Sequence, residues 1–356
     1  MRVLHITNYF PDCHKKIGGA EIAVKRLIEK EDDEHFIMTL PFKGNKDNIF
    51  KVYPLKSLRT LHLTLLPFSL IVFIQSLSIL RKVKPDVIYI HNLKEITFAP
   101  LLAARLLDIP VYSWIYDYFF FCPYSTLFNR KTWRPCKKFH GDCSDCLGIV
   151  GKLFILRKII FNWFLKMIDY FIVLSESSRS ILIKYGIESY RIIKYRLSFP
   201  KLGKLRKKVE ENLILYVGWV VPHKGLHILV KAMKEVIKRK KNVKLCVIGD
   251  YEVNSDYTSY IKDLIRRYKL KENVILLGRK SFDEVREFYS KAKVVVIPEQ
   301  WENVSPLVAI EAKHFKKKIV ASKIGGIPEI LEGADAILVE PSNYKSFARA
   351  ILRVIK

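Results

Sequence analysis

The sequence predicts an α/β protein with two domains, each built on a doubly wound parallel sheet. Apolar, β-branched runs such as residues 293–298 alternate along the chain with longer stretches of helical periodicity, and this alternation favours parallel sheets covered by helices. The chain has 356 residues, enough for two domains of ordinary size. We therefore expect an N-terminal domain at 1–198, a polar and basic linker at 199–212, and a C-terminal domain at 213–356.

The charge of the chain restricts the class of partner. The formal net charge is +27 at pH 7, which favours phosphorylated substrates, an anionic membrane surface or nucleic acid. Nucleic acid is not an expected partner, because the charge is dispersed and no nucleic-acid-binding motif is present. Only Gln75 and Gln300 are glutamines, a bias that resembles proteins from hot environments.

The N-terminus indicates where the protein works. Residues 1–8 are typical of a first strand and lack the apolar core of a signal peptide, so we expect a cytoplasmic protein with reduced or metal-bound cysteines. Residues 61–80 contain no Asp, Glu, Lys or Arg and could span a membrane by length. However, Pro67 interrupts this stretch, and a span would separate the first strand from its partners. We expect a helix at 67–80 that is either buried or pressed into a bilayer interface.

The first domain carries its candidate functional residues where predicted strands end. Gly18 and Gly19 follow the first strand and open a helix; they either let a phosphate or sugar approach the backbone or serve a turn with positive φ. A later strand ends at His91, and the next one ends at Tyr116 and Asp117. Ligands bind at the carboxyl ends of strands in open parallel sheets, so these residues are candidates for a site.

Four cysteines lie in an insertion at residues 117–148: Cys122, Cys136, Cys143 and Cys146. The last two are separated by two residues, the spacing of half a zinc site, but the other half is spaced too loosely to be a strong signal. The insertion is either a structural zinc site, with His140 as a substitute ligand, or a loop of reduced thiols.

Residues 150–167 mix aromatic and basic side chains on one predicted helix. Such a helix suits the headgroup region of a membrane, but it could equally be a core helix whose lysines extend to the solvent. Strands at 169–174 and 191–195 complete the first domain, and Ser175 caps the helix between them.

The second domain repeats the alternation. Strands are expected at 213–217, 243–249, 274–277, 293–298 and 319–322, and helices at 226–238, 261–268, 282–292 and 347–354. A further helix starts at Ser305 and Pro306, as N-cap and first helical residue, and ends at 316–318. The N–H groups at its start favour an anion, and Glu302 and Glu311 can accept hydrogen bonds from sugar hydroxyls.

The run Trp301-Glu302-Asn303, with Pro306-Leu307-Val308 and Glu311-Ala312 after it, resembles the donor-site signature of family 4 glycosyltransferases. These are retaining enzymes of the GT-B fold, in which two Rossmann-like domains face a central cleft. The resemblance implies that Glu311 takes the ribose hydroxyls of a nucleotide sugar. The family's other glutamate lies eight residues earlier, where this chain has Asn303, so either Glu302 or Asn303 faces the donor hexose.

The resemblance assigns further site residues and also shows departures. Val304 and Ser305 are expected to line the donor site, and Lys224 matches a lysine that holds the donor diphosphate. Trp219 stands where the family has the second cation of that clamp, so this cation is either missing or supplied from elsewhere.

In the first domain, Gly18 and Gly19 resemble the family's Gly-Gly-x-Glu loop. Tyr116-Asp117 replaces the His-Asp pair that lies near the reacting sugar. The contact of that histidine therefore passes to Tyr116, Asp117 or His91, or the activity is altered. Similar cysteines occur in a subset of the family, which supports a structural role for the cysteines of the insertion.

These features predict a transferase that moves a hexose-type sugar, with retention, from a nucleotide-diphosphate sugar to a glycan or lipid-linked acceptor. We expect it to act in the cytoplasm, either free or at the anionic inner face of the membrane. No Asp-x-Asp metal motif lies near the proposed site, so no catalytic cofactor is expected, and zinc would be structural. The alternative is a catalytically impaired or non-enzymatic protein that binds polyanions or nucleotides on the same scaffold.

Overall fold

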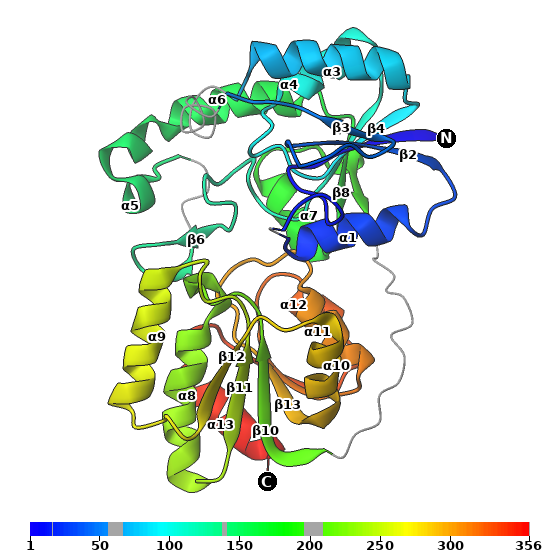
Figure 1. Ribbon diagram of the computed structural model, residues 1–356. Helices are drawn as coiled ribbons and strands as arrows, with labels where there is room; N and C mark the ends of the chain where they lie inside the picture. The colour runs from blue at the N-terminus through cyan, green and yellow to red at the C-terminus, as the bar shows by residue number, and fades with distance from the viewer. Residues whose placement is uncertain (16, 56–66, 137–140, 196–208, 356) are drawn as a thin grey trace. The chain divides into compact units, whose positions relative to one another are not determined.

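The computed structural model describes residues 1–15, 17–55, 67–136, 141–195 and 209–355 (Figure 1). The chain divides into two units. Unit 1 comprises 1–127 and 136–197, and unit 2 comprises 128–135 and 198–356. Most of the expected linker at 199–212 lies outside the described residues.

Unit 1 contains a seven-stranded sheet in the order β3-β2-β1-β4-β5-β8-β9, and every neighbouring pair is parallel. The strands are β1 (Arg2–Ile6), β2 (Glu34–Thr39), β3 (Ile49–Lys51), β4 (Val87–Ile90), β5 (Val111–Trp114), β8 (Tyr170–Val173) and β9 (Ile192–Lys194). Strand β1 pairs with both β2 and β4, so the order of strands reverses between β1 and β4. Ligands bind at such a switch point in doubly wound sheets.

The helices of unit 1 cover both faces of this sheet. They are α1 (Gly19–Ile28), α3 (Leu70–Val83), α4 (Ala99–Leu106), α5 (Ser144–Leu147), η2 (Gly148–Leu153), α6 (Phe154–Leu165), α7 (Glu176–Lys184) and η3 (Ser189–Arg191). Helices α3 and α4 pack against each other on one face, and α1 lies on the other (Figure 1). The hydroxyls of Ser69 and Ser175 cap α3 and α7, which satisfies backbone N–H groups at both starts.

Unit 2 has a six-stranded parallel sheet in the order β12-β11-β10-β13-β14-β15. The strands are β10 (Glu210–Val217), β11 (Lys244–Ile248), β12 (Val274–Gly278), β13 (Ala292–Ile297), β14 (Lys318–Ser322) and β15 (Ala336–Val339). Here the order reverses between β10 and β13. The loops that follow these two strands therefore meet at the switch point of the second sheet.

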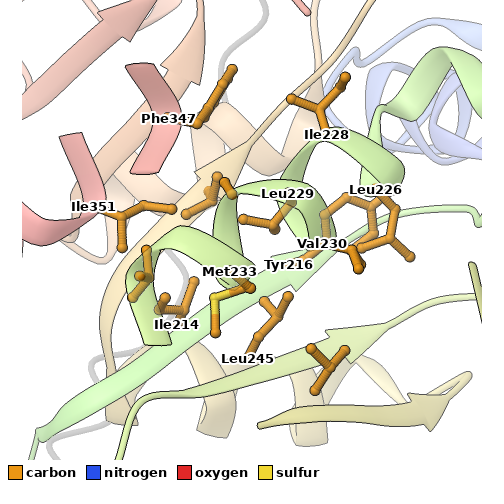
Figure 2. Close-up of a cluster of buried hydrophobic side chains, with 14 of the residues drawn as sticks. Ile214, Tyr216, Leu226, Ile228, Leu229, Val230, Met233, Leu245, Phe347 and Ile351 are labelled. Carbon is orange, nitrogen blue, oxygen red and sulfur yellow. The ribbon is translucent and has the colours of Figure 1, made fainter. Parts of the chain in front are cut away.

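Two hydrophobic cores sandwich the sheet of unit 2. Its helices are η4 (Pro222–Lys224), α8 (Leu226–Arg239), α9 (Ser255–Arg267), α10 (Phe282–Lys291), α11 (Leu307–His314), α12 (Ile327–Ile330) and α13 (Tyr344–Val354). Alternate residues of β10 point to opposite faces. Ile214 and Tyr216 join α8 and α13 (Figure 2), and α9 belongs to the same core. Leu213 and Leu215 join α10, α11 and α12 on the other face.

A short hairpin from the predicted insertion belongs to unit 2. Its strands β6 (Phe128–Asn129) and β7 (Arg134–Pro135) are antiparallel. The ring of Trp133 lies 5.0 Å from that of His227 in α8, and 5.5 and 5.3 Å from those of Tyr257 and Tyr260 in α9. The sequence assigned the whole insertion to the first domain. The structure differs for 128–135 because this aromatic contact joins them to unit 2.

The predicted α/β alternation is confirmed, and its departures lie mainly at helix ends. Helix α9 begins at Ser255 rather than 261, because the side chain of Asn254 accepts the N–H of Tyr257 and starts the helix earlier. Helix α11 begins at Leu307, since Pro306 has an extended ψ of 119°, and no side chain caps it. It ends at His314, so the predicted end at 316–318 is wrong.

The predicted apolar helix at 67–80 corresponds to α3. Val72, Ile79 and Leu80 are buried, while Leu70 and Ile74 are exposed, so the helix is a core element with an apolar outer edge. Residues 61–66 lie outside the described residues. Among the helices that the structure describes, none is long and apolar enough to cross a bilayer.

Candidate functional site

Two backbone loops meet at the switch point of unit 2. The loop after β10 contains Gly225, whose φ of +75° is in the left-handed region. A Cβ atom there would lie 1.8 Å from the carbonyl oxygen of Pro298, which begins the loop after β13. Only glycine permits this approach, and it holds the neighbouring Lys224 against the second loop.

Glu299 is the centre of the polar network between these loops. One carboxylate oxygen accepts a hydrogen bond from Nζ of Lys224 at 2.7 Å. The other accepts from Nε1 of Trp301 at 2.6 Å and from Nδ2 of Asn303 at 2.7 Å. Glu299 is 3% exposed, and a carboxylate is stable at that depth only when donors satisfy it in this way.

Lys224 remains able to bind a ligand. Its side chain is 21% exposed, and an ammonium has three N–H donors, of which Glu299 takes one. Its Nζ also lies 5.4 Å from the centre of the Trp301 ring. The lysine is therefore held in place at the switch point while keeping donors for an anion.

Asn303 shapes the loop after β13 through both its side chain and its backbone. Its Oδ1 accepts the N–H of Ser305 at 3.3 Å, and its carbonyl accepts the N–H of Gly326 at 2.7 Å. Val304 is buried beside it, and Glu302 is partly exposed. The amide of Asn303 is therefore engaged within the loop, and the choice between Glu302 and Asn303 as the residue facing the donor sugar stays a prediction.

Glu311 is a buried acid on α11. It is 8% exposed, and its Oε2 accepts a hydrogen bond from the hydroxyl of Tyr289 on α10 at 3.0 Å. Burial beside this carboxylate raises the pKa of Tyr289, which keeps the phenol protonated as a donor. Tyr289 thus fixes the orientation of the carboxylate that the sequence assigned to a ribose.

In unit 1 the structure brings together the three predicted residues that follow β4 and β5. The ring of His91 lies 5.8 Å from that of Tyr116, and Asp117 accepts the backbone N–H of Phe119 at 2.8 Å. All three line a cavity of about 20 Å³. Burial lowers the pKa of His91 and raises the pKa of Tyr116 and of Asp117, so burial favours the neutral form of each.

Gly18 and Gly19 lie at the start of α1, as predicted. Gly18 has a φ of −118°, so a turn with positive φ is not the reason for glycine here. Its N–H donates to the carboxylate of Glu21 at 2.8 Å. Gly18 is the N-cap residue of α1, a position where glycine is favoured without a ligand, so the close approach of a ligand to this backbone stays a prediction.

The four cysteines of the insertion are free thiols. The pKa of Cys143 is raised to about 12, first by burial and then by the neighbouring thiols of Cys122, Cys136 and Cys146, so the four lie near one another. Within the described ranges, no three His, Cys, Asp or Glu side chains could hold a metal ion. His140 lies outside those ranges, and structural zinc stays a prediction that metal analysis of the purified protein would test.

Sequence reasoning missed Glu299 as a site residue, although it lies only two residues before the signature run that begins at Trp301. The available signal was its position: an acid that follows a buried strand directly, at the switch point of the sheet. Its partner Lys224 is 75 residues away in sequence, so their pairing follows only from the fold.

Comparisons with known proteins place the chain among glycosyltransferases. Residues 17–194 match the model of glycosyltransferase family 4, and residues 200–356 match that of glycosyl transferases group 1. The uncharacterized glycosyltransferase MJ1178 of Methanocaldococcus jannaschii is 26% identical over 362 residues, covering 100% of this chain and 88% of that protein.

Two further relatives match over shorter segments. The uncharacterized glycosyltransferase MJ1607 of Methanocaldococcus jannaschii is 33% identical over 147 residues. The lipopolysaccharide 1,2-N-acetylglucosaminetransferase of Salmonella typhimurium is 32% identical over 151 residues. Each match covers 41% of this chain, and the chain spans only 36% and 40% of the two proteins.

Solved structures share the fold at low identity. Anabaena Alr3699/HepE in complex with UDP-glucose superposes with a TM-score of 0.74 at 16% identity, covering 100% of this chain and 90% of that one. The sucrose-phosphate synthase of Thermosynechococcus elongatus gives a TM-score of 0.71 at 17% identity, with coverage of 99% and 89%. Together with the family match over residues 17–194, this fold shows that the chain belongs to glycosyltransferase family 4 and has the GT-B fold.

Proposed function

We propose that the protein transfers a sugar from a nucleotide-diphosphate sugar to a glycan or lipid-linked acceptor. The observation that carries the proposal is the network of Lys224, Glu299, Trp301 and Asn303 at the switch point of unit 2. It holds a cation with free donors where doubly wound sheets bind nucleotides. Membership of the family supports the same donor class.

The donor is held by charge and by hydrogen bonds. Lys224 carries the diphosphate, and as the bond to the sugar breaks it stabilises the negative charge that develops on the leaving group. Glu311, oriented by Tyr289, accepts the ribose hydroxyls. Glu302 or Asn303 faces the sugar, as the resemblance to the family implies. A hexose-type sugar and retention of configuration are the forms that the resemblance to the family suggests.

We propose Arg130 as the second cation of the diphosphate clamp, since Trp219 stands at the position where the family has that cation. It lies in the hairpin of unit 2, where Phe128 contacts the ring of His223 at 6.1 Å. The pKa of His223 is lowered to about 3, first by burial and then by the charges of Lys224 and Arg130. The charge of Arg130 therefore acts on His223, the residue before Lys224, and this supports the proposal.

The acceptor side is assigned to unit 1. His91, Tyr116 and Asp117 lie together at the ends of β4 and β5, and Gly18 and Gly19 expose backbone at the start of α1. Hydroxyl groups of a carbohydrate are both donors and acceptors, and these side chains offer both.

An anionic membrane surface is the proposed location of the reaction. Helix α6 buries one side of its surface, including Arg157, whose guanidinium donates to the carbonyls of Phe119 and Phe120. The side of α6 left exposed is apolar and basic, with Ile155, Leu156, Lys158, Ile159 and Trp163, and the exposed Lys152 and Lys166 flank the helix. Such a surface suits a headgroup interface on the cytoplasmic side.

Sedimentation with vesicles rich in phosphatidylglycerol tests the membrane surface. Ile159→Asp adds a negative charge to the exposed side of α6 and is expected to abolish binding. Val253→Asp makes the same change at an exposed apolar residue of unit 2 and is expected to retain it. Equal binding by both variants would contradict the assignment of α6.

The donor is tested by thermal-shift titration with UDP-, GDP- and ADP-sugars. A ligand that binds only the folded state raises the melting temperature. We expect a shift with one nucleotide class that is lost in Glu311→Ala, and lost or reduced in Lys224→Met. An unchanged shift in Glu311→Ala would overturn the role of that residue, and no shift with any donor would overturn the proposed function.

A further inference from the structure

Three histidines form a chain of hydrogen bonds across the sheet of unit 1. Nδ1 of His5 lies 2.9 Å from Nε2 of His91, and Nε2 of His5 lies 3.0 Å from Nδ1 of His35. Nε2 of His35 lies 3.2 Å from the backbone carbonyl oxygen of Glu31. The chain therefore runs from β2 through β1 to the end of β4.

The carbonyl at one end fixes every proton along this chain. A carbonyl oxygen only accepts, so Nε2 of His35 carries a proton, and in the neutral ring Nδ1 then accepts from Nε2 of His5. A neutral His5 then accepts on Nδ1 from Nε2 of His91. Burial lowers the pKa of His5 to about 3 and that of His91 below its ordinary value, which favours neutral rings. His91 is left with an unprotonated Nδ1.

That Nδ1 atom belongs to a group of polar atoms around one cavity. His91, Ser113, Trp114 and Tyr116 all line the cavity of about 20 Å³. Nδ1 of His91, Oγ of Ser113, Nε1 of Trp114 and the hydroxyl of Tyr116 are all buried without a hydrogen-bond partner among the described residues. Buried polar atoms are costly unless satisfied, and this volume admits one oxygen atom with its hydrogens.

We infer that the cavity binds a single hydroxyl oxygen, and that His35 and His5 are positioning residues that keep Nδ1 of His91 as its acceptor. The ligand oxygen donates to Nδ1 of His91 and accepts from Nε1 of Trp114, since an indole N–H can only donate. A water molecule and a carbohydrate hydroxyl share this chemistry. The inference rests on the proposed function only in assigning the hydroxyl to the acceptor sugar.

The tautomers can be measured without activity. In protein labelled with ¹⁵N-histidine, long-range ¹⁵N–¹H correlation spectra distinguish protonated from unprotonated ring nitrogens. We expect His5, His35 and His91 to carry the proton on Nε2 at neutral pH. A proton on Nδ1 of His91 would overturn the inference. His314→Asn, at an exposed position, removes one set of signals as an assignment control.

Substitution of His35 provides a matched pair. Asparagine places an oxygen near the position of Nδ1 and preserves the acceptor for His5, whereas leucine removes it. In His35→Leu, we expect His91 to populate both tautomers and kcat to fall by at least roughly tenfold, less than the 10²–10⁴ of a lost proton-transfer group. The KM for the donor should stay unchanged, and His35→Asn should restore both readouts. Unchanged tautomers in His35→Leu would overturn the role of His35.

A crystal structure at a resolution that shows ordered water tests the cavity. We expect one oxygen within hydrogen-bond distance of Nδ1 of His91 in the free protein. In crystals soaked with a carbohydrate acceptor, a sugar hydroxyl should replace it. A retained water would assign the cavity to water alone and overturn the acceptor assignment. An empty cavity would overturn the inference, even if donor binding supports the proposed function.

Discussion

At the scale of single residues, the buried carboxylate of Glu299 determines the geometry of the candidate donor site. It joins three donors from two loops, and two of these donors are themselves residues of the signature stretch. A residue of this kind acts through its neighbours: it need not touch a ligand to decide where the ammonium of Lys224 lies.

Removal of this carboxylate tests its role. Glu299→Ala leaves the donors of Lys224, Trp301 and Asn303 without their acceptor. We expect the free energy of unfolding of unit 2 to fall by about 2 kcal/mol, below the 3–5 kcal/mol typical of a fully buried pair, because Lys224 keeps contact with solvent. Urea denaturation measures this change.

Glu299→Gln is the matched control. Its amide oxygen can still accept from Trp301 or Asn303, so it should recover part of the stability, but its amide nitrogen cannot accept from Lys224. Donor affinity should therefore remain reduced in both variants. A Glu299→Ala protein with the stability and donor affinity of the unmodified chain would contradict the central role of this carboxylate.

At the scale of elements, the loops at the strand ends are fixed by backbone contacts as much as by side chains. Gly225→Ala places a methyl group against the carbonyl oxygen of Pro298, 1.8 Å away before relaxation. The loops must then separate, and donor binding should weaken more than stability, because Lys224 is adjacent. Donor titration and thermal unfolding of the same variant measure both effects.

Gly278→Ala separates the steric contact from backbone strain. Gly278 has the same φ of +75° in the same unit, but the nearest atom to its Cβ would lie 4.0 Å away. The free energy of unfolding of this variant should fall only by the roughly 1–2 kcal/mol that a residue other than glycine costs in the left-handed conformation. Donor binding that falls equally in the two variants would show that the contact with Pro298 is unimportant.

A separate prediction concerns the contribution of the hairpin of β6 and β7 to stability. Trp133→Ala removes a ring that packs on His227, Tyr257 and Tyr260. The free energy of unfolding of unit 2 should fall by up to about 3 kcal/mol, the lower end for aromatic truncations, since the ring is only partly buried. Lys131→Ala, on the same hairpin, is the exposed control and should have little effect on chemical denaturation.

Sequence reasoning predicted some elements of unit 2 and missed others. Strong apolar periodicity predicted the β10–α8 and β13–α11 units that carry Lys224 and Glu311. The preference of proline for the first helical position gave a wrong prediction at Pro306, which precedes α11 in an extended conformation. The hairpin's place in unit 2 could not be predicted, because its contacts with α8 and α9 join residues about a hundred positions apart.

The whole molecule combines two sheets whose switch points carry different chemistry. In unit 2 the switch point holds a cation satisfied by a buried acid, which suits an anionic donor. In unit 1 it holds uncharged rings around a small cavity, which suits a hydroxyl group. Sequence reasoning placed both groups at strand ends. It missed the histidine chain, because His5 and His35 lie on two strands and His91 directly after a third, and only the sheet brings them together.

This burial of neutral histidines predicts how stability depends on pH. Burial lowers the pKa of His5 in unit 1 and of His227 in unit 2 to about 3, from an ordinary value of 6.5. Below pH 6.5 the unfolded chain binds protons that the folded chain excludes, so stability falls as the pH decreases towards 3. Each histidine contributes up to about 1.4 kcal/mol per pH unit in this window. Burial raises the pKa of Asp117, so this carboxyl has the opposite effect on the pH dependence of stability: the folded chain binds its proton more tightly than the unfolded chain.

The histidine contribution can be isolated in unit 2, where Nδ1 of His227 lies 2.8 Å from the hydroxyl of Tyr257. We expect His227→Gln to lower stability at pH 7.5 but to flatten its decline between pH 6.5 and 4.5, because glutamine binds no proton in either state. Urea midpoints at several pH values measure the slope. A slope equal to that of the unmodified chain would mean that His227 is protonated in the folded protein and that its burial does not exclude the charge.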